Sequence, residues 1–287
     1  MTKHPHLLFG RFRFSLDPAH PPLVMGILNL TPDSFSDGGK FPTLDSAISH
    51  AEQMMAEGVD IIDIGGESSR PGALPLSDEE ELERVMPVLY ALRDCGKPLS
   101  VDTCKPLVMR EAIAAGADMI NDINGFRAEG ALAAVSDSEV ALCIMHMLGE
   151  PRSMQHHPQY EDVVTELTQY FKDRVAECSL AGIAQRRLCI DPGFGFGKTL
   201  PHNLALLQNL RHFQQALGLP VLAGLSRKTM IGALTGKPVE GRLAGSLAAA
   251  LVAAEQGARI IRVHDVAETV DALKVWQAAR QLHTSGE

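Results

Sequence analysis

The stretch Gly58-Val-Asp-Ile-Ile-Asp63 decides the fold, because the same plan returns at 116–121 (Gly-Ala-Asp-Met-Ile-Asn) and at 257–262 (Gly-Ala-Arg-Ile-Ile-Arg). In each copy a glycine ends an amphipathic segment, a position where positive φ is tolerated. A short apolar strand follows, and a polar residue stands at the strand's C-terminal end. The repeat therefore predicts alternating helices and strands.

Working outward, continuous apolar runs recur along the whole chain, and such runs are typical of strands buried on both faces. The runs are Leu23–Leu30, Ile61–Ile64, Leu99–Val101, Met119–Ile120, Ala141–Met145, Leu188–Ile190, Val221–Ala223 and Ile260–Val263. Amphipathic segments between them include Leu44–Glu57, Asp78–Leu92, Pro106–Ala115, Val163–Ala181 and Ala267–Gln281. About eight such units predict an α/β protein with a (β/α)₈ TIM barrel. An open doubly wound sheet is the alternative, but no glycine fingerprint follows the first strand.

The whole chain, 1–287, reads as a single domain, because no Ser/Gly linker or charge block divides it. Residues 1–20 form a possible N-terminal hairpin or extension, since Phe and Arg alternate over Phe9–Phe14. A frayed terminus is the competing interpretation.

Composition narrows the class of protein. The chain is 45% hydrophobic and carries a net charge of −9, which argues against disorder and against a nucleic-acid partner. Five cysteines without a C-x-x-C pair suit reduced thiols in a cytoplasmic protein. We expect neither a signal peptide nor a membrane partner, because the most apolar stretch, Leu243–Ala254, is too short to span a bilayer.

Polar residues stand at almost every predicted strand end, where a barrel holds its active site. They are Asn29, Asp63, Glu67, Asp102, Asn121, Asp122, His146, Asp191, Ser226, Arg227, Lys228, Arg262 and His264. The carboxylates suit a ring rich in N–H donors, and the cations suit phosphate. We expect these side chains to surround one opening, the mouth of the barrel at the C-terminal ends of the strands. The carboxylates should lie on one side of the mouth and the cations on the other.

Two Gly-rich loops, 31–39 and 65–72, follow the first two strands and are interpreted as lids, although ordinary turns would have similar residues. The stretch Pro192-Gly-Phe-Gly-Phe-Gly-Lys-Thr199 fails the P-loop pattern, because proline stands where that pattern requires glycine.

At these residues the chain resembles the dihydropteroate synthase family. The matching stretches are MGILNLTPDSFSDGG (25–39), DIGGESSRPGA (63–73), SVDTCKP (100–106), INDI (120–123), DPGFGFGKTLPHN (191–203), LSRKTMIG (225–232) and IRVHDV (261–266). The resemblance implies the barrel fold. It also implies condensation of 6-hydroxymethyl-7,8-dihydropterin pyrophosphate with p-aminobenzoate to give 7,8-dihydropteroate and pyrophosphate in folate biosynthesis.

The resemblance also implies roles for single residues. Asp37, Asp102, Lys228, Arg262 and His264 are implied to be catalytic, with Asp37 ordering a closed loop. The pterin site is implied to contain Asp102, Asn121, Met145, Asp191, Gly224 and Lys228. Phe35, Pro71, Phe196 and Ser226 are implied to surround p-aminobenzoate. Arg262 and His264 are implied to bind pyrophosphate, Ser69 and Arg70 an anion nearby, and Asn29 the cofactor Mg²⁺.

Two departures from the family pattern are small: Ser69 replaces the usual Thr, and Cys104 stands where Tyr is frequent. Family analogy further implies a homodimer, with the 241–256 helix or the C-terminal helix as candidate interfaces, and sensitivity to sulfonamides. Two alternatives remain open. A methyltetrahydrofolate-binding methyltransferase would need no pyrophosphate site, and a non-catalytic paralogue would bind pterin without turnover.

Overall fold

Eight parallel strands form the centre of the molecule. The computed structural model describes residues 6–17, 19–31, 43–68, 74–149, 154 and 157–284. The parallel strands are β3 (Leu23–Asn29), β4 (Ile61–Gly65), β5 (Leu99–Asp102), β6 (Met119–Asp122), β7 (Ala141–Met145), β8 (Leu188–Asp191), β9 (Leu222–Ala223) and β10 (Ile260–Val263). Their order in the sheet is β8-β7-β6-β5-β4-β3-β10-β9.

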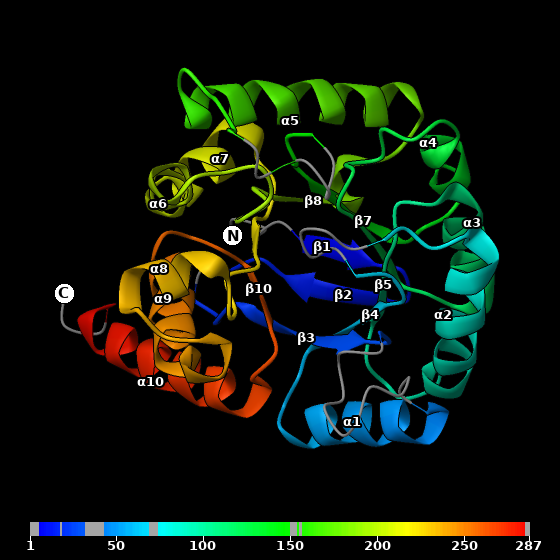
Figure 1. The fold of residues 1–287 in the computed structure, drawn as a ribbon, viewed down its shortest axis with the longest axis horizontal. Coiled ribbons are helices and arrows are strands. Elements are labelled where there is room, and N and C mark those ends of the chain that lie inside the picture. Colours follow the sequence, from blue (N-terminus) through cyan, green and yellow to red (C-terminus); the bar gives the residue numbers. More distant parts are fainter. Residues whose placement is uncertain are drawn as a thin grey trace.

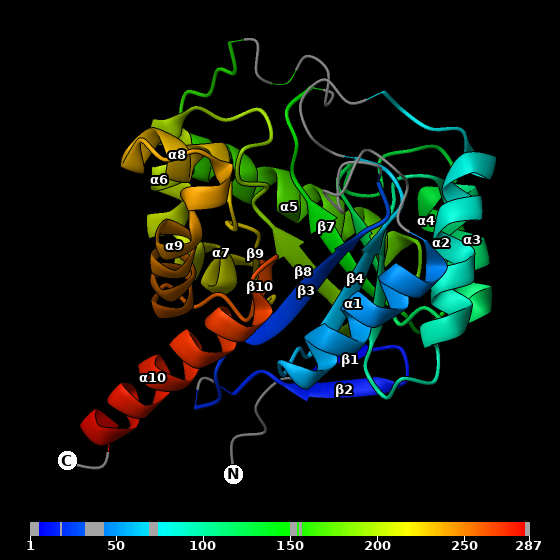
Figure 2. The same ribbon diagram turned by 60° about the horizontal axis from the view of Figure 1, so that its bottom comes forward.

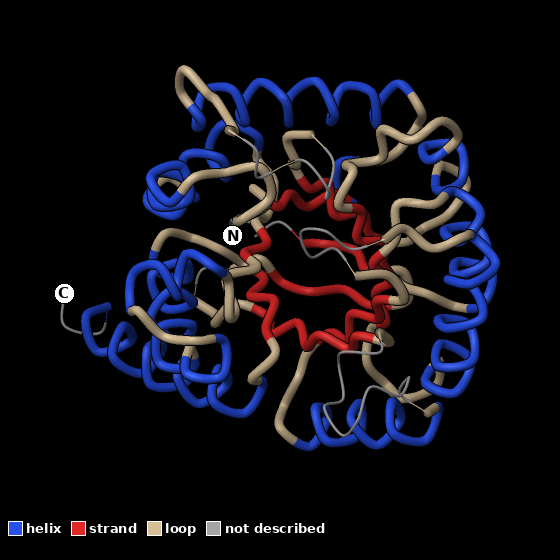
Figure 3. The backbone as a smooth tube through the Cα atoms, viewed as in Figure 1, coloured by secondary structure: helices blue, strands red, loops and turns tan. Residues whose placement is uncertain are grey.

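The sheet closes on itself between its two outer strands. A parallel bridge joins Ile190 of β8 to Val221, just before β9, and Ile190 N–H donates to the Pro220 carbonyl at 3.1 Å. Figure 3 shows the strands as a ring with the helices outside it. The predicted (β/α)₈ barrel is therefore confirmed.

Helices surround this ring, as Figure 1 shows. They are α1 (Leu44–Ala56), α2 (Asp78–Leu92), α3 (Pro106–Ala115), α4 (Ala131–Val135), α5 (Val163–Leu180), α6 (Leu200–Gln208), α7 (Leu210–Leu217), α8 (Thr229–Thr235), α9 (Leu243–Glu255) and α10 (Val266–Thr284). Local sequence fixes their ends: Ser77 and Glu80 form a capping box at the start of α2. The repeat glycines Gly58, Gly116 and Gly257 all have positive φ, as the repeat predicts. Across the part of the chain that is described, no helix combines the length and apolarity that crossing a bilayer requires.

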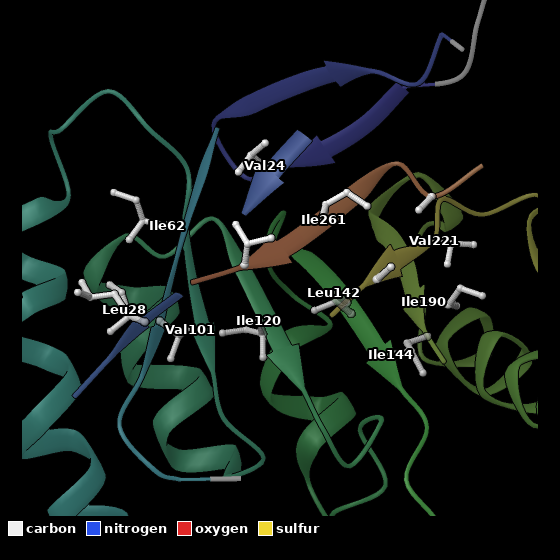
Figure 4. Packing of buried hydrophobic residues seen from close by; sticks show 14 of the residues in the cluster. Val24, Leu28, Ile62, Val101, Ile120, Leu142, Ile144, Ile190, Val221 and Ile261 are labelled. Carbon is white, nitrogen blue, oxygen red and sulfur yellow. The ribbon is translucent and has the colours of Figure 1, made fainter. Parts of the chain in front are cut away.

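Alternate strand residues face opposite sides of the barrel wall. Ile62, Ile120 and Ile261, the fifth residues of the three repeats, lie in the large cluster between strands and helices, and Figure 4 shows this packing. Ile61, Met119 and Ile260, the fourth residues, lie in a second cluster inside the barrel. The sixth residue of each repeat therefore points inward as well, one layer nearer the strands' C-terminal ends.

The N-terminal segment forms an antiparallel hairpin of β1 (His6–Phe9) and β2 (Phe12–Ser15). Leu7 and Phe9 are almost completely buried and pack in the interior cluster, with Ile61 and Met119. Figure 2 shows the hairpin across one end of the barrel. Because the hairpin fills the N-terminal end with apolar side chains, the polar mouth lies at the opposite, C-terminal end.

Candidate active site at the C-terminal mouth of the barrel

The sixth residues of the three repeats form one hydrogen-bonded group. Arg262 Nε donates to Asp63 Oδ2 at 2.6 Å. Asn121 Nδ2 donates to the same oxygen at 3.3 Å. Asp63 is completely buried, so its charge is stabilised by these two donors rather than by water. The repeat thus builds the centre of the mouth as well as the barrel wall.

A second carboxylate shares the Arg262 guanidinium. Arg262 Nη2 donates to Asp102 Oδ2 at 2.8 Å. The expected separation of cations from carboxylates is therefore wrong: the arginine lies between Asp63 and Asp102. The physical reason is that all three side chains project inward from neighbouring strands, where an unpaired guanidinium or carboxylate would be costly to bury.

Burial strongly perturbs the acid–base properties of Asp102. It raises the pKa of the Asp102 carboxyl to about 7, an effect that Arg262 opposes and Asp63 reinforces. Two carboxylates on one guanidinium leave the group with one excess negative charge, so a proton is more easily held there. Asp102 is the partly exposed carboxylate of the group, with 16% of its side chain exposed, whereas the Asp63 side chain is completely buried. It is consequently the carboxylate that can accept from a ligand.

Asp191 and Lys228 lie on the other side of the mouth. Asp191 Oδ1 accepts from Gly193 N–H at 2.7 Å, and a side chain at Gly224 would come within 3.8 Å of its second oxygen. Lys228 Nζ stands 4.2 Å from the centre of the Phe196 ring. Burial raises the pKa of the Asp191 carboxyl. Burial also lowers the pKa of the Lys228 ammonium to about 8, although attraction between Lys228 and Asp191 opposes this shift.

Ser226 contacts two nitrogens of His264. The Ser226 Oγ accepts from the His264 backbone N–H at 3.2 Å and lies 3.0 Å from His264 Nδ1. In the tautomer in which Nδ1 accepts from the Ser226 hydroxyl, Nε2 carries the ring N–H. Burial, with Arg262 and Arg227 nearby, lowers the pKa of His264 to about 3. His264 therefore offers an anion a neutral donor, and Arg262 offers the charge.

Asn29 and Met145 complete the described part of the predicted site. Asn29 ends β3 opposite Gly65, and a Cβ on Gly65 would lie 3.3 Å from Asn29 Oδ1. Met145 pairs in register with Asp191 and packs with Phe196 in a small cluster that includes two further methionines. The structure thus brings together the predicted residues that it describes: Asn29, Asp102, Asn121, Met145, Asp191, Phe196, Gly224, Ser226, Lys228, Arg262 and His264.

Five predicted residues lie outside the described part of the chain: Phe35, Asp37, Ser69, Arg70 and Pro71. The root of the second loop is described. Glu67 contacts the ammonium of Lys105, which also contacts the buried Glu81 of α2. The chain that leads into that loop is therefore tied to the helices behind the barrel wall.

Sequence reasoning named Asp63 among the strand-end residues but gave it no role in the site. The structure makes it the partner that holds both Arg262 and Asn121. The repeat could have indicated this role, because residues at the same repeat position lie in the same inward layer of the barrel. Asp63 shares the sixth position with Asn121 and Arg262. Within the described residues, no three His, Cys, Asp or Glu side chains cluster as a ready-made metal site.

The comparison with known proteins agrees with this geometry. Residues 25–264 match the family described as pterin binding enzyme. The dihydropteroate synthase of Haemophilus influenzae is 54% identical over 260 residues, which cover 90% of this chain and 94% of the relative. The chain belongs to the dihydropteroate synthase family. The relatives matched at this level are transferases of folate biosynthesis.

Solved structures of dihydropteroate synthases share the fold. The Burkholderia cenocepacia protein complexed with 7,8-dihydropteroate is 51% identical with a TM-score of 0.89, covering 98% of this chain and 99% of that one. The Xanthomonas albilineans protein with 4-aminobenzoic acid is 52% identical with a TM-score of 0.89, covering 96% and 98%. The Yersinia pestis protein in a sulfonamide drug complex is 48% identical with a TM-score of 0.90, covering 96% and 99%.

Exchange of Asp63 tests its role directly. We predict that Asp63→Asn lowers kcat/KM by about 10- to 100-fold, because a charge-assisted hydrogen bond to Arg262 is weakened. The matched control is Asp60→Asn, which changes a carboxylate at the opposite end of β4, where Asp60 accepts from Val24 N–H. Steady-state kinetics of both variants measure the difference. Equal activity of Asp63→Asn and wild type would show that Arg262 needs no partner at this position.

Proposed function

We propose that this chain is a dihydropteroate synthase in which one continuous mouth binds the pterin ring, p-aminobenzoate and the pyrophosphate. It joins 6-hydroxymethyl-7,8-dihydropterin pyrophosphate to p-aminobenzoate, giving 7,8-dihydropteroate and pyrophosphate. The observation that carries the proposal is the contact between Asp102 and Arg262. It places an acceptor for ring N–H groups directly beside a cation for the leaving group.

The ring end of the substrate is assigned to the carboxylate-rich part of the mouth. A 2-amino-pyrimidinone edge presents several N–H donors, and Asp102 and Asp191 are the acceptors there. Asn121 and Lys228 add an amide and an ammonium group, so ring acceptors also find donors. The Burkholderia cenocepacia relative, whose structure contains 7,8-dihydropteroate, supports this assignment.

The p-aminobenzoate end is assigned to Phe196, in the turn after β8, and to Ser226, in the turn after β9. The phenyl ring of Phe196 offers an aromatic face, and its contact with Lys228 joins this wall to the pterin end. The Xanthomonas albilineans relative with 4-aminobenzoic acid supports a subsite of this kind. Phe35 and Pro71 are proposed to complete it.

The pyrophosphate end is assigned to Arg262 and His264, with Ser69 and Arg70 nearby. Asn29 fits a supporting role in holding Mg²⁺, because its amide oxygen is a hard ligand and Gly65 leaves the space beside it free of a side chain. Magnesium in proteins keeps few protein ligands when substrate phosphates supply the others. When bound, the ion supplies positive charge at the departing pyrophosphate.

The reaction breaks the bond between the exocyclic CH₂ and the pyrophosphate oxygen and forms a bond from that carbon to the aryl nitrogen. Pyrophosphate leaves with the electron pair, and the amine loses a proton to water or to pyrophosphate. Arg262 and His264 stabilise the charge that develops on the leaving group. The carboxylates beside the ring favour a cation-like carbon, so we expect cleavage to precede attack by the amine.

A product assay tests the function. Purified chain, the pterin pyrophosphate, p-aminobenzoate and Mg²⁺ are expected to give 7,8-dihydropteroate by mass spectrometry, and chelation of the metal is expected to abolish turnover. With p-aminobenzoate omitted, we expect slow pyrophosphate release or isotope exchange. Absence of dihydropteroate from the complete reaction contradicts the function. Product formation without any release or exchange in the omission experiment contradicts early cleavage alone.

The pH dependence of pterin binding tests the roles of Asp102 and Lys228. We predict that binding of 6-hydroxymethyl-7,8-dihydropterin, which has no phosphate to titrate, tightens as pH rises through about 7, because Asp102 ionises there. Binding then weakens above about 8 as Lys228 loses its proton. Below the pKa of Asp102, the dissociation constant rises about tenfold for each unit by which the pH falls.

Fluorescence titration of wild type, Asp102→Asn and Lys228→Met assigns the two limbs. Asp102→Asn removes the rising limb, and Lys228→Met removes the falling limb. An unchanged rising limb in Asp102→Asn assigns the titration to another group and contradicts this account.

We further propose that the chain acts in the cytoplasm as a homodimer. Val252 of α9 and Val275 of α10 are exposed apolar side chains on two helices that pack together, so each helix offers apolar area to a second copy. Sedimentation velocity at micromolar concentration measures the assembly. A purely monomeric species overturns this part of the proposal.

A further inference from the structure

The turn at residues 193–197, after β8, is built from three glycines and two phenylalanines. Gly193, Gly195 and Gly197 all have positive φ. A Cβ on Gly193 would lie 2.0 Å from the His146 carbonyl oxygen, so the turn lies directly against the segment that follows β7. A backbone so rich in glycine has much conformational freedom to lose. Its single conformation must therefore be imposed by neighbouring groups.

Side chains outside the turn hold its backbone at successive points. Asn203 Oδ1 accepts from Gly195 N–H at 2.8 Å, and the Tyr160 hydroxyl donates to the Gly197 carbonyl at 3.0 Å. Lys198 Nζ donates to the Phe196 carbonyl at 3.0 Å. Lys198 is thus the side chain that fixes the backbone of the residue whose ring faces Lys228.

The Lys198 side-chain nitrogen is buried with three acceptors around it. Only 3% of the residue is exposed, and burial lowers its pKa to about 7, which attraction to Asp191 opposes. Besides the Phe196 carbonyl, Nζ bonds the His146 carbonyl at 3.2 Å and lies 3.0 Å from His146 Nδ1. The protonated side chain has three donors, and these three acceptors match them, so moving any acceptor leaves a donor unpaired.

His146 can serve as acceptor only while its ring is neutral. Burial and the adjacent Lys198 lower the pKa of His146 to about 2, and the ring packs edge-on against Tyr170 with centroids 4.8 Å apart. The imidazole is therefore neutral near pH 7, and in its Nε2–H tautomer Nδ1 accepts from Lys198. The pair spans two segments, since His146 follows β7 and Lys198 follows the turn after β8.

We propose that Lys198 and His146 are positioning residues that set the place of the Phe196 ring, and hence the wall of the p-aminobenzoate subsite. The inference rests on the proposed function. Neither residue needs to touch a substrate. They act by fixing the Phe196 carbonyl, so that the ring stays 4.2 Å from the Lys228 ammonium.

Lys198→Met is the primary test, because methionine keeps the apolar stem and removes the donors. We expect the KM for p-aminobenzoate to rise about tenfold, as for loss of a charge-assisted hydrogen bond, while kcat and the KM for the pterin pyrophosphate change by less than about threefold. Lys172→Met, the same exchange on the exposed side of α5, is the matched control. Equal rises in both KM values indicate a merely structural role and overturn the inference.

A double-mutant cycle with Phe196→Ala asks whether Lys198 acts through the ring. We expect Phe196→Ala alone to raise the KM for p-aminobenzoate, and Lys198→Met to add little to it, because residues acting as one unit are not additive. Additive effects overturn the inference. If the wild-type enzyme makes dihydropteroate but Phe196→Ala leaves the KM for p-aminobenzoate unchanged, the positioning role of Lys198 is overturned. The proposed function stands in that case.

A pair of His146 variants provides a test that does not depend on the folding of Lys198→Met. His146→Gln retains an acceptor that can reach Lys198, whereas His146→Leu has none. We expect the KM for p-aminobenzoate to stay within about threefold of wild type in the first and to rise about tenfold in the second. The same KM in both variants overturns the role of the Nδ1 acceptor.

Discussion

The sharing of one partly buried guanidinium by two carboxylates is the interaction on which the rest of the site depends. Arg262 is bound by Asp63 through Nε and by Asp102 through Nη2. A buried ion pair offers little net stability, so its value here is geometric. It holds a cation directly beside a carboxylate, and in the proposed function these two groups serve the leaving group and the ring. The two ends of a pterin pyrophosphate are joined by a short bridge, and the protein groups for both ends are correspondingly adjacent.

The two carboxylates have different positions and therefore different tasks. Asp63 is completely buried and holds Asn121 as well as the arginine, so it belongs to the frame of the barrel. Asp102 is partly exposed, and the pKa of its carboxyl is raised to about 7, so it is the partner that can turn to a ligand. In the proposed complex with substrate, we expect Asp63 to stay paired with Arg262 while the other edge of the guanidinium becomes available to phosphate oxygens.

Much of this arrangement could be predicted from sequence, because the barrel repeats a six-residue plan and strand ends are marked by polar residues. The ends of α2 and α3 agree with the amphipathic pattern, and Asp102, Asp191 and Lys228 meet as expected. The separation of charges into two flanks was wrong, since spacing along the chain does not tell which inward side chains bond each other. The amphipathic segments named from the sequence did not include the short helices α4, α6, α7 and α8. For α4 and α8, one or two turns give little periodicity. Lys198 stood in a stretch noted as a failed P-loop and as a match to the family, but it was given no role, and no local pattern indicates that its side chain bonds His146.

A crystal structure of this chain with the pterin pyrophosphate, in the absence of p-aminobenzoate, would show whether Arg262 stays bonded to Asp63 while it binds the substrate. We expect the N–H edge of the pterin ring to lie on Asp102 and Asp191, phosphate oxygens to lie on Arg262, and Arg262 Nε to remain bonded to Asp63. A ring bound away from Asp102, or a guanidinium that leaves Asp63 to follow the phosphate, would contradict this expectation.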